Sequence, residues 1–204
     1  MATTPFLGSR TSALPTQHGT AVVLRAGRAR RTRGSPLFTV ASYLKALRAD
    51  RDPQARLRDG VRLLPALVDG CHHASVTTVA GGRIEVRAAS DATSRRADEL
   101  QEERGEGPCL QAVRTGHSVV SPDLSTESRW LGWCSAAAGE LPVASVLSVL
   151  LIATPLPLAT LDLYSDTVHG LSGVDIGLLH TLAAPLAGAL LDGRIDLHLL
   201  GPAA

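Results

Sequence analysis

The spacing of the apolar residues changes abruptly at Asp69-Gly70, and this change restricts the fold more than any other feature of the chain. Before it, apolar residues recur at helical spacing in two stripes, over residues 40–47 and 57–68. After it, residues 74–79 are rich in β-branched side chains, and residues 83–89 alternate apolar and charged ones, with a glycine pair between the two runs. The pattern predicts two helices followed by an antiparallel hairpin with one face exposed to water.

The rest of the chain returns to helix and then alternates between the two kinds of element. No glycine-rich nucleotide-binding motif occurs in it. The order predicts an α+β fold: a mixed, mainly antiparallel sheet flanked by helices. The further expected elements are a helix at 91–104 capped by Asp91, a short helix from Pro108 to about 113, a strand at 117–121, a helix from Ser125 to about 139, strands at 143–153 and 158–165 joined through residues 155–157, and a last helix at about 174–191.

The 204-residue chain has a net charge of only +1, but this charge is unevenly divided. Residues 1–49 hold eight basic side chains and no acidic one, whereas residues 50–204 hold 12 basic and 19 acidic ones. Such asymmetry indicates a tail attached to a domain. We therefore divide the chain into a basic, disordered N-terminal arm (1–39) and a folded domain (40–204) with its core at about 54–192.

The arm leaves three interpretations open. Its five arginines between residues 25 and 33 could bind nucleic acid or anionic lipid through charge alone. An arginine-rich N-terminus without acidic residues is also typical of organellar transit peptides. The third interpretation is an unstructured extension, whose removal at residues 1–36 would leave the fold intact. Apart from this arm, we expect no nucleic-acid partner.

The remaining composition predicts where the protein works. No uninterrupted apolar run approaches 18 residues, so we expect neither a transmembrane helix nor a membrane partner. The three cysteines, Cys71, Cys109 and Cys134, form no CxxC pair and are too few for a disulfide framework. They are typical of free thiols in a reducing compartment, which predicts a cytoplasmic protein.

Four stretches, taken in order, resemble a known family. They are Gly70-Cys-His-His-Ala-Ser-Val76, Gly105-Glu-Gly-Pro-Cys109, Asp123-Leu-Ser-Thr-Glu-Ser-Arg-Trp130 and Leu161-Asp-Leu-Tyr-Ser165. Over about residues 68–191 the chain resembles a GAF domain, specifically the GAF part of actinobacterial GAF–ANTAR transcription antiterminators. The resemblance implies a GAF-like (PAS-like) fold and a role in signal transduction or transcription regulation, and it implies no cofactor.

The chain also departs from that family in three ways. Only about a dozen residues follow the last predicted helix, where the antiterminators carry an RNA-binding ANTAR module, so antitermination is not carried over. Pro185 falls inside that helix, where proline costs roughly 3 kcal/mol, and this disfavours a homodimer built on a straight terminal helix. The signature of cyclic-nucleotide-binding GAF domains is missing, so cyclic nucleotides are not expected.

Cys109 is the candidate redox residue. Pro108 places it in the first turn of a helix, where free N–H groups and the helix dipole would favour the thiolate and lower the pKa. Alternatively, Cys109 is a small apolar residue packed beneath the turn. Its context also resembles that of GAF-fold free methionine-(R)-sulfoxide reductases, in which Cys109 would be catalytic and Cys134 its resolving partner.

Five side chains are candidates for binding a ligand. Trp130 and Trp133 lie three apart on a predicted helix, where they would either wall a pocket or anchor the helix over the sheet. Thr160, Asp162 and Tyr164 share one face of a predicted strand and could orient a small ligand between the sheet and the helices. A half-exposed sheet face would give the same pattern without a ligand.

Cys71, His72 and His73 are a dense group of metal-ligating residue types. Adjacent histidines on a strand point to opposite faces, and no second pair of ligands lies at metal spacing. We therefore expect a structural or surface role for them and no metal.

Together these observations predict a non-catalytic regulatory domain. It would bind a small molecule or sense redox state, and would signal to a partner regulator or to a second copy of itself. Two alternatives stay open: the free methionine-(R)-sulfoxide reductase, and a ligand-free interaction or dimerisation module whose pocket is filled by its own side chains.

Overall fold

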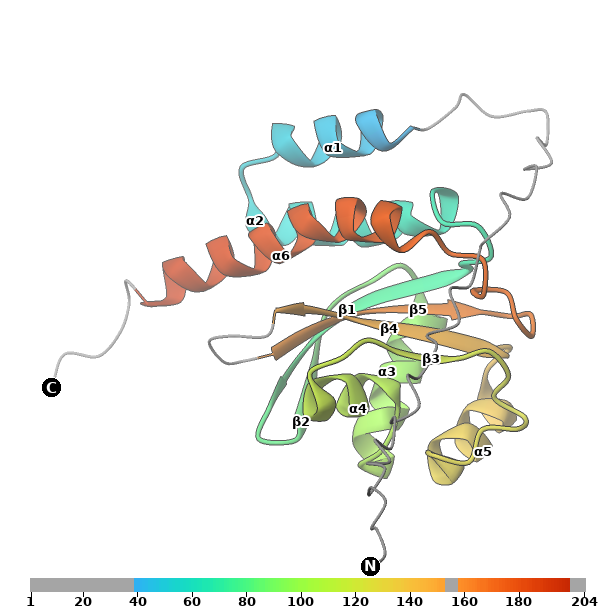
Figure 1. Ribbon diagram of the computed structural model, residues 1–204. Helices are drawn as coiled ribbons and strands as arrows, with labels where there is room; N and C mark the ends of the chain where they lie inside the picture. The colour runs from blue at the N-terminus through green and yellow to red at the C-terminus, as the bar shows by residue number, and fades with distance from the viewer. Residues whose placement is uncertain (1–38, 153–157, 199–204) are drawn as a thin grey trace, which may run out of the picture. The chain divides into compact units, whose positions relative to one another are not determined.

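The computed structural model describes residues 39–152 and 158–198. The expectations for the arm up to residue 38, for the link at residues 155–157 and for residues 199–204 lie outside this range. Within it, the chain forms a five-stranded sheet with helices on both faces, as the α+β prediction requires (Figure 1).

The sheet is antiparallel throughout and has the strand order β2-β1-β5-β4-β3. The predicted hairpin of β1 and β2 turns through Gly81 and Gly82, whose φ angles of 58° and 80° suit glycine. The central strand, β5, pairs with both β1 and β4 and so joins residues distant in sequence. The strands are β1 (His73–Ala80), β2 (Arg83–Ala89), β3 (Val119–Ser121), β4 (Ser145–Ile152) and β5 (Leu158–Ser165).

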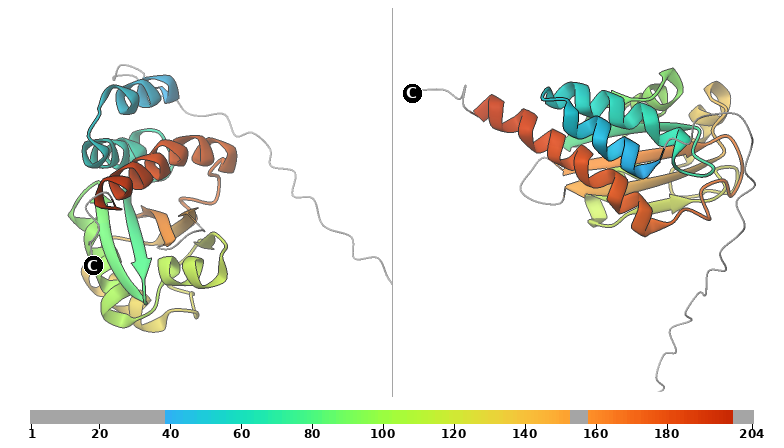
Figure 2. Two further views of the ribbon diagram at one scale, coloured as in Figure 1. Left: turned by 90° about the vertical axis from the view of Figure 1, so that its left-hand side faces the viewer. Right: turned by 90° about the horizontal axis from the view of Figure 1, so that it is seen from above.

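Helices cover both faces of the sheet (Figures 1 and 2). On one face lie α2 (Pro53–Leu63) and α6 (Ile176–His198), and α1 (Val40–Ala49) packs on these two helices, on the side away from the sheet. On the opposite face lie α3 (Ala92–Arg104), α4 (Pro108–Thr115) and α5 (Leu131–Glu140).

Local sequence signals account for most of the helix ends. The side chains of Asp52 and Asp91 accept hydrogen bonds from backbone N–H groups at the starts of α2 and α3. α3 ends at Gly105, which has a φ of 65°, and Pro108 occupies the first position of α4, as predicted. Pro65 lies in a single 3-10 turn (Leu64–Ala66) that closes α2.

Two predicted helix boundaries are wrong. The helix expected from Ser125 begins only at Leu131, because Ser125 instead closes a turn, in which its N–H and hydroxyl donate to Asp123 Oδ1 at 2.9 and 2.6 Å. The last helix runs to His198 rather than to about residue 191, and it continues through Pro185. Its buried face extends past the proline to Leu190, and we attribute its continuity to this packing.

The two faces of the sheet bury different kinds of side chain. Towards α2 and α6 the sheet presents apolar residues such as Val76, Leu161 and Leu163, which pack in one cluster with Leu182 and Leu186 of α6. The alternate strand positions face α3, α4 and α5, and several of these carry hydroxyl or carboxyl groups. The polar candidates on β5 therefore share one face, as predicted.

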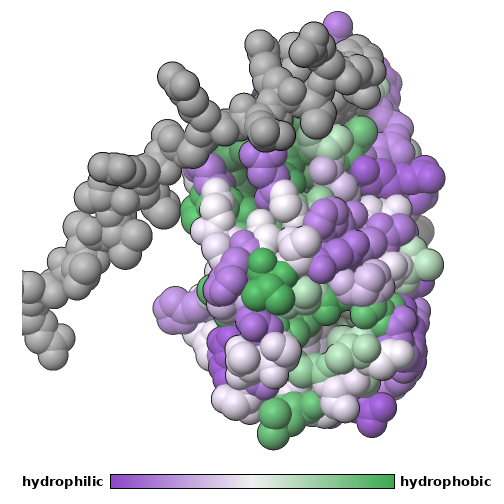
Figure 3. Space-filling view, turned by 90° about the vertical axis from the view of Figure 1, so that its right-hand side faces the viewer, coloured by the Kyte–Doolittle hydropathy of each residue, from purple (hydrophilic) through white to green (hydrophobic). Residues whose placement is uncertain are grey.

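Contrary to the sequence expectation, α6 contains a stretch, Ile176–Gly193, that by length and composition alone could span a membrane; a third of this stretch is buried. The core helix of a folded domain passes the same test, and Leu179, Leu182 and Leu186 of α6 are fully buried in the apolar cluster. On the side shown in Figure 3, hydrophobic residues are scattered among hydrophilic ones.

Candidate functional site

A cluster of polar side chains lies buried between the sheet and α3 and α4; we call it the polar cluster. Asp162 of β5 is at its centre. Its Oδ1 accepts a hydrogen bond from the Ser148 hydroxyl of β4 at 2.5 Å, and its Oδ2 accepts from Thr160 at 2.8 Å and from Thr77 of β1 at 3.3 Å. All four residues have no solvent exposure. The half-exposed sheet face considered from the sequence is therefore wrong, because helices cover these positions.

The second carboxyl group of the polar cluster comes from α3. The Tyr164 hydroxyl donates to Asp98 Oδ1 at 2.5 Å, and Gln101 donates to the same tyrosine oxygen at 3.0 Å. Gln101 Oε1 in turn accepts the backbone N–H of Cys109 at 2.8 Å and so caps α4. Gly107 is required for this contact, because a Cβ there would lie 2.4 Å from Gln101 Oε1.

Within the described residues the two carboxyl groups have no cation in hydrogen-bond contact, although the charge of the exposed Arg95 lowers the pKa of Asp98 by less than burial and Asp162 raise it. In residues 39–152 and 158–198, neither Asp98 nor Asp162 has a hydrogen bond or ion pair with a Lys, Arg or His side chain. Asp98 Oδ2 and the nearby Ser75 hydroxyl are buried, and neither has a hydrogen bond of good geometry in this part of the chain. Such groups are expensive to bury and are commonly found at functional sites.

Burial determines the electrostatics of the polar cluster. Burial, and then the charge of Asp162, raise the pKa of Asp98 well above its usual value. Burial also raises the pKa of Asp162 to about 6, although the hydroxyls that donate to it act in the opposite direction. Burial and the neighbouring carboxyl groups likewise raise the pKa of Tyr164. Burial therefore makes both carboxyl groups harder to ionise than an exposed aspartate.

Cys109 lies at the edge of the polar cluster but is not an activated thiol. Its Sγ is 3.2 Å from the Thr77 hydroxyl, and the side chain is fully buried against Val79 and Ile84. Burial, and then the charge of Asp162, raise the pKa of Cys109 well above its usual value. The lowered pKa expected from its place at a helix start is therefore wrong, because loss of solvation outweighs the helix dipole.

The other candidate cysteine belongs to a different part of the core. Cys134 packs with both tryptophans rather than with the neighbours of Cys109, and burial raises its pKa to about 11. Cys71, Cys109 and Cys134 are all free and buried.

The two tryptophans pack beside the polar cluster. Trp130 precedes α5 with a non-helical φ of −140°, so the expectation that both residues lie on one helix is wrong. Their rings nevertheless meet edge to face, with centroids 6.0 Å apart, and their apolar cluster includes Tyr164. Their indole N–H groups bond to Gln111 and Ala97, at 2.8 and 3.0 Å. This packing agrees with the alternative in which the tryptophans anchor a helix over the sheet.

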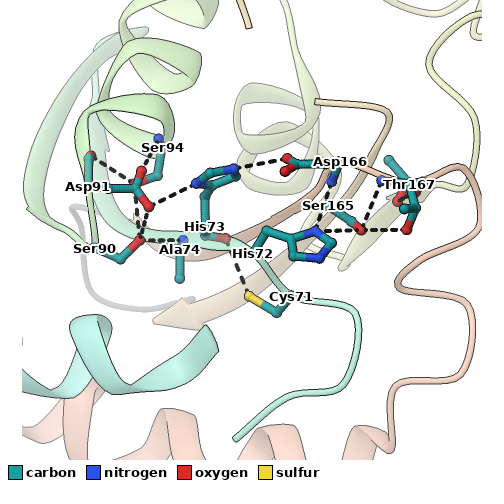
Figure 4. A network of polar contacts seen from close by, with 11 residues as sticks. Cys71, His72, His73, Ala74, Ser90, Asp91, Ser94, Ser165, Asp166 and Thr167 are labelled. Carbon is teal, nitrogen blue, oxygen red and sulfur yellow. Dashed lines mark hydrogen bonds and ion pairs between the residues drawn. The ribbon is translucent and has the colours of Figure 1, made fainter. Parts of the chain in front are cut away.

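The side chains around Cys71 belong to a hydrogen-bonded network (Figure 4). His73 joins two elements, with Nδ1 2.8 Å from Asp91 and Nε2 2.9 Å from Asp166. His72 Nδ1 accepts the N–H of Asp166 at 3.0 Å. No group of three or more metal-ligating side chains in the described part of the chain has the geometry to hold an ion.

Several residues of the polar cluster had not been identified from the sequence. Asp98 and Gln101 lie on a helix so rich in charge that two inward-facing polar residues give no distinct signal. Thr77 has a residue type common in any strand. Ser148 did carry a signal, because it interrupts an otherwise apolar strand.

Comparison with known proteins agrees with this architecture. The sequence profile of the GAF domain family matches residues 50–191. The chain belongs to the GAF domain family. None of the curated proteins compared with it matches. The finer resemblance, to the GAF domains of ANTAR-containing antiterminators, stays a prediction.

Solved structures that resemble this GAF domain have different activities. Free methionine-R-sulfoxide reductase from Neisseria meningitidis, solved with its substrate, is 17% identical with a TM-score of 0.59, over 78% of this chain and 89% of that one. The GAF domain of an Acinetobacter phosphoenolpyruvate-protein phosphotransferase is 12% identical with a TM-score of 0.58, over 78% and 94%. A domain of a putative sensor histidine kinase from Sinorhizobium meliloti is 13% identical with a TM-score of 0.51, over 78% and 97%. At these identities the likeness shows the fold alone.

Proposed function

We propose that this GAF domain is a non-catalytic regulatory domain that binds a small molecule bearing a cationic group in the polar cluster. The observation that carries the proposal is the pair of fully buried carboxyl groups, Asp98 and Asp162, neither of which is hydrogen-bonded or ion-paired to a cation in the described residues. A ligand ammonium or amidinium group would supply the missing charge and take the place of a bound proton.

The surrounding groups suit such a ligand. The hydroxyls of Ser75, Thr77, Thr160 and Tyr164 can each accept or donate a hydrogen bond. In the structure described here the side chains of the polar cluster bond to one another, so a ligand must displace some of these bonds. The segment from α3 to α4, with glycines at positive φ, is the element we expect to move. Movement of α4 would pass the binding event on to a partner regulator or a second copy, in a cytoplasmic protein.

A thermal-shift screen tests the proposal. The probes are amines, each paired with the neutral alcohol or amide of equal length, and the proteins are wild type, Asp162→Asn and the exposed control Asp59→Asn. At 100 times its dissociation constant a ligand adds about 2.7 kcal/mol to the free energy of unfolding. We expect at least one amine, and not its neutral counterpart, to raise the melting temperature of the wild type and control but not of Asp162→Asn. If no amine shifts the wild type, the ligand-free interaction module becomes the better account.

The second candidate is a free methionine-(R)-sulfoxide reductase that uses Cys109. It is favoured by the position of Cys109 beside the polar cluster, in a fold that two such reductases share. The Cys109 thiol would take the sulfoxide oxygen and become a sulfenic acid, releasing methionine, and added dithiothreitol would reduce it again. Incubation with free methionine sulfoxide and dithiothreitol tests this; we expect no turnover, and turnover that Cys109→Ser abolishes would replace our proposal.

A further inference from the structure

A second concave site lies on the opposite side of the sheet, among α1, α2 and α6. Figures 1 and 2 show α1 packed on α2 and α6, on the side away from the sheet. A groove of about 450 Å³ lies between α1 and α6, and this volume is in the range of small-molecule sites. It is separate from the polar cluster and does not depend on the proposed function.

Most of the groove is apolar. Leu44 and Leu47 of α1 line one side, and Ala184, Pro185 and Gly188 of α6 line the other. Gly188 leaves the groove open, since a Cβ added there would meet no atom within 4 Å. An apolar chain lying along these residues would lose its contact with water.

Two arginines also line the groove. Arg48 of α1 is exposed and has no ion pair in the described residues, while Arg56 of α2 pairs with Asp192 through Nη2 at 2.5 Å. The Nε atom of Arg56 is buried and has no hydrogen-bond partner among the described residues. Because Asp192 follows Gly188 by one turn of α6, the Arg56 guanidinium lies towards the C-terminal end of the groove. Guanidinium groups are suited to a carboxylate or similar anion, and in the described residues that of Arg48 has no ion pair, whereas that of Arg56 already pairs with Asp192.

We propose that this groove binds a small amphiphilic anion, with its acid group at Arg48 and Arg56 and its apolar chain along Leu44, Leu47 and Pro185. Because Asp192 compensates the charge of Arg56, the charge of Arg48 selects the acid, and the apolar walls between the helices accept the chain. Since α1 and α6 both contact the ligand, binding would hold the two helices together at their exposed edge.

Calorimetric titration with octanoate, and with octanamide as its neutral counterpart, tests this proposal. We expect octanoate to bind the wild type, with octanamide weaker by about tenfold or more. Gly188→Leu should fill the groove and abolish binding, whereas Gly139→Leu, at an equally open helical glycine in α5, should not change it. Arg48→Gln should weaken octanoate binding by about tenfold, and Arg58→Gln, on an exposed position of α2, should leave it unchanged.

Two results would overturn the proposal. One is octanoate binding that is absent from the wild type or unaffected by Gly188→Leu. The other is a dimer, seen by sedimentation velocity, that Gly188→Leu dissociates and octanoate does not, because a second copy would then occupy the groove. Unfolding curves recorded for each variant distinguish loss of the site from loss of the fold, and Gly188→Leu is expected to be no less stable than the wild type.

Discussion

Replacing Asp162 with asparagine is predicted to stabilise the protein at neutral pH. Asparagine has nearly the same shape, so its oxygen can still accept from Ser148, and its amide can donate to Thr160, which still bonds to Thr77. What the variant loses is a charge in a site without a counterion. Burial raises the pKa of Asp162 from 3.8 to about 6. At about 1.4 kcal/mol per pKa unit, the ionised side chain destabilises the native protein by up to about 3 kcal/mol.

The raised pKa of Asp162 also determines how the stability difference between variant and wild type changes with pH. Because the pKa of Asp162 is higher in the folded than in the unfolded chain, the native protein binds more protons between about pH 4 and pH 6. The free energy of unfolding of the wild type therefore falls, as far as Asp162 determines it, when the pH rises through that window. Asparagine does not titrate, so the free energy of unfolding of the variant should equal that of the wild type near pH 4 and exceed it by up to about 3 kcal/mol above pH 6.

Urea unfolding of both proteins, at intervals from pH 4 to pH 8, measures this difference. Only the variant-minus-wild-type value is interpreted, since surface carboxylates change the stability of both proteins equally. Asp59→Asn, an exposed aspartate on α2, serves as the control and should differ little from wild type at any pH. An Asp162→Asn protein that is less stable than wild type at pH 8, or a difference independent of pH, would refute the reasoning.

Three further predictions follow from other parts of the domain. Glu127→Gln should lower the free energy of unfolding by about 1 kcal/mol at pH 7. Hydrogen bonds from Arg129 lower the pKa of Glu127 to about 2, so this loss should fade as the pH falls from about 4.5 towards 2, and a constant loss would contradict the ion pair. Gly70→Ala should destabilise by more than about 2 kcal/mol, since its φ is 77° and a Cβ would lie within 2 Å of a backbone oxygen. Gly81→Ala, also at positive φ but in open space, should cost only about 1 kcal/mol; equal losses in urea unfolding would be evidence against the clash. Native Cys109 should react with a thiol reagent at pH 8 far more slowly than it does in urea, because it is fully buried with a raised pKa, and rapid labelling of the native thiol would contradict this.

The sequence predicted the fold where local signals agreed with tertiary packing. The hairpin follows from alternation around a glycine pair, and α4 follows from proline at its first position. The start of α5 was missed because Ser125 can either cap a helix or close a turn. The hydrogen bond from its N–H to Asp123 Oδ1 stabilises the turn. The last helix was predicted through Pro185 to about residue 191, but its end was missed because Asp192-Gly193, a pair typical of helix ends, lies inside α6, which runs to His198.

The site was predicted only in part, for a similar reason. Alternation on β5 placed Thr160, Asp162 and Tyr164 on one face, and that placement is confirmed. Alternation along one strand does not reveal what covers the face, and α3 supplies the second carboxyl group from Asp98. The raised pKa of Cys109 could not be foreseen either, because it depends on this tertiary burial rather than on the helix start.

Carbon-13 NMR of the side-chain carboxyl group of Asp162, followed through a pH titration, tests the central claim most directly. A carboxyl group buried beside a second one and without a cation should titrate with a midpoint near 6, well above an exposed aspartate. A bound amine should lower that midpoint, because it supplies the missing positive charge. A midpoint at or below 4 in the protein alone would contradict the account, because the carboxyl group would then already be compensated.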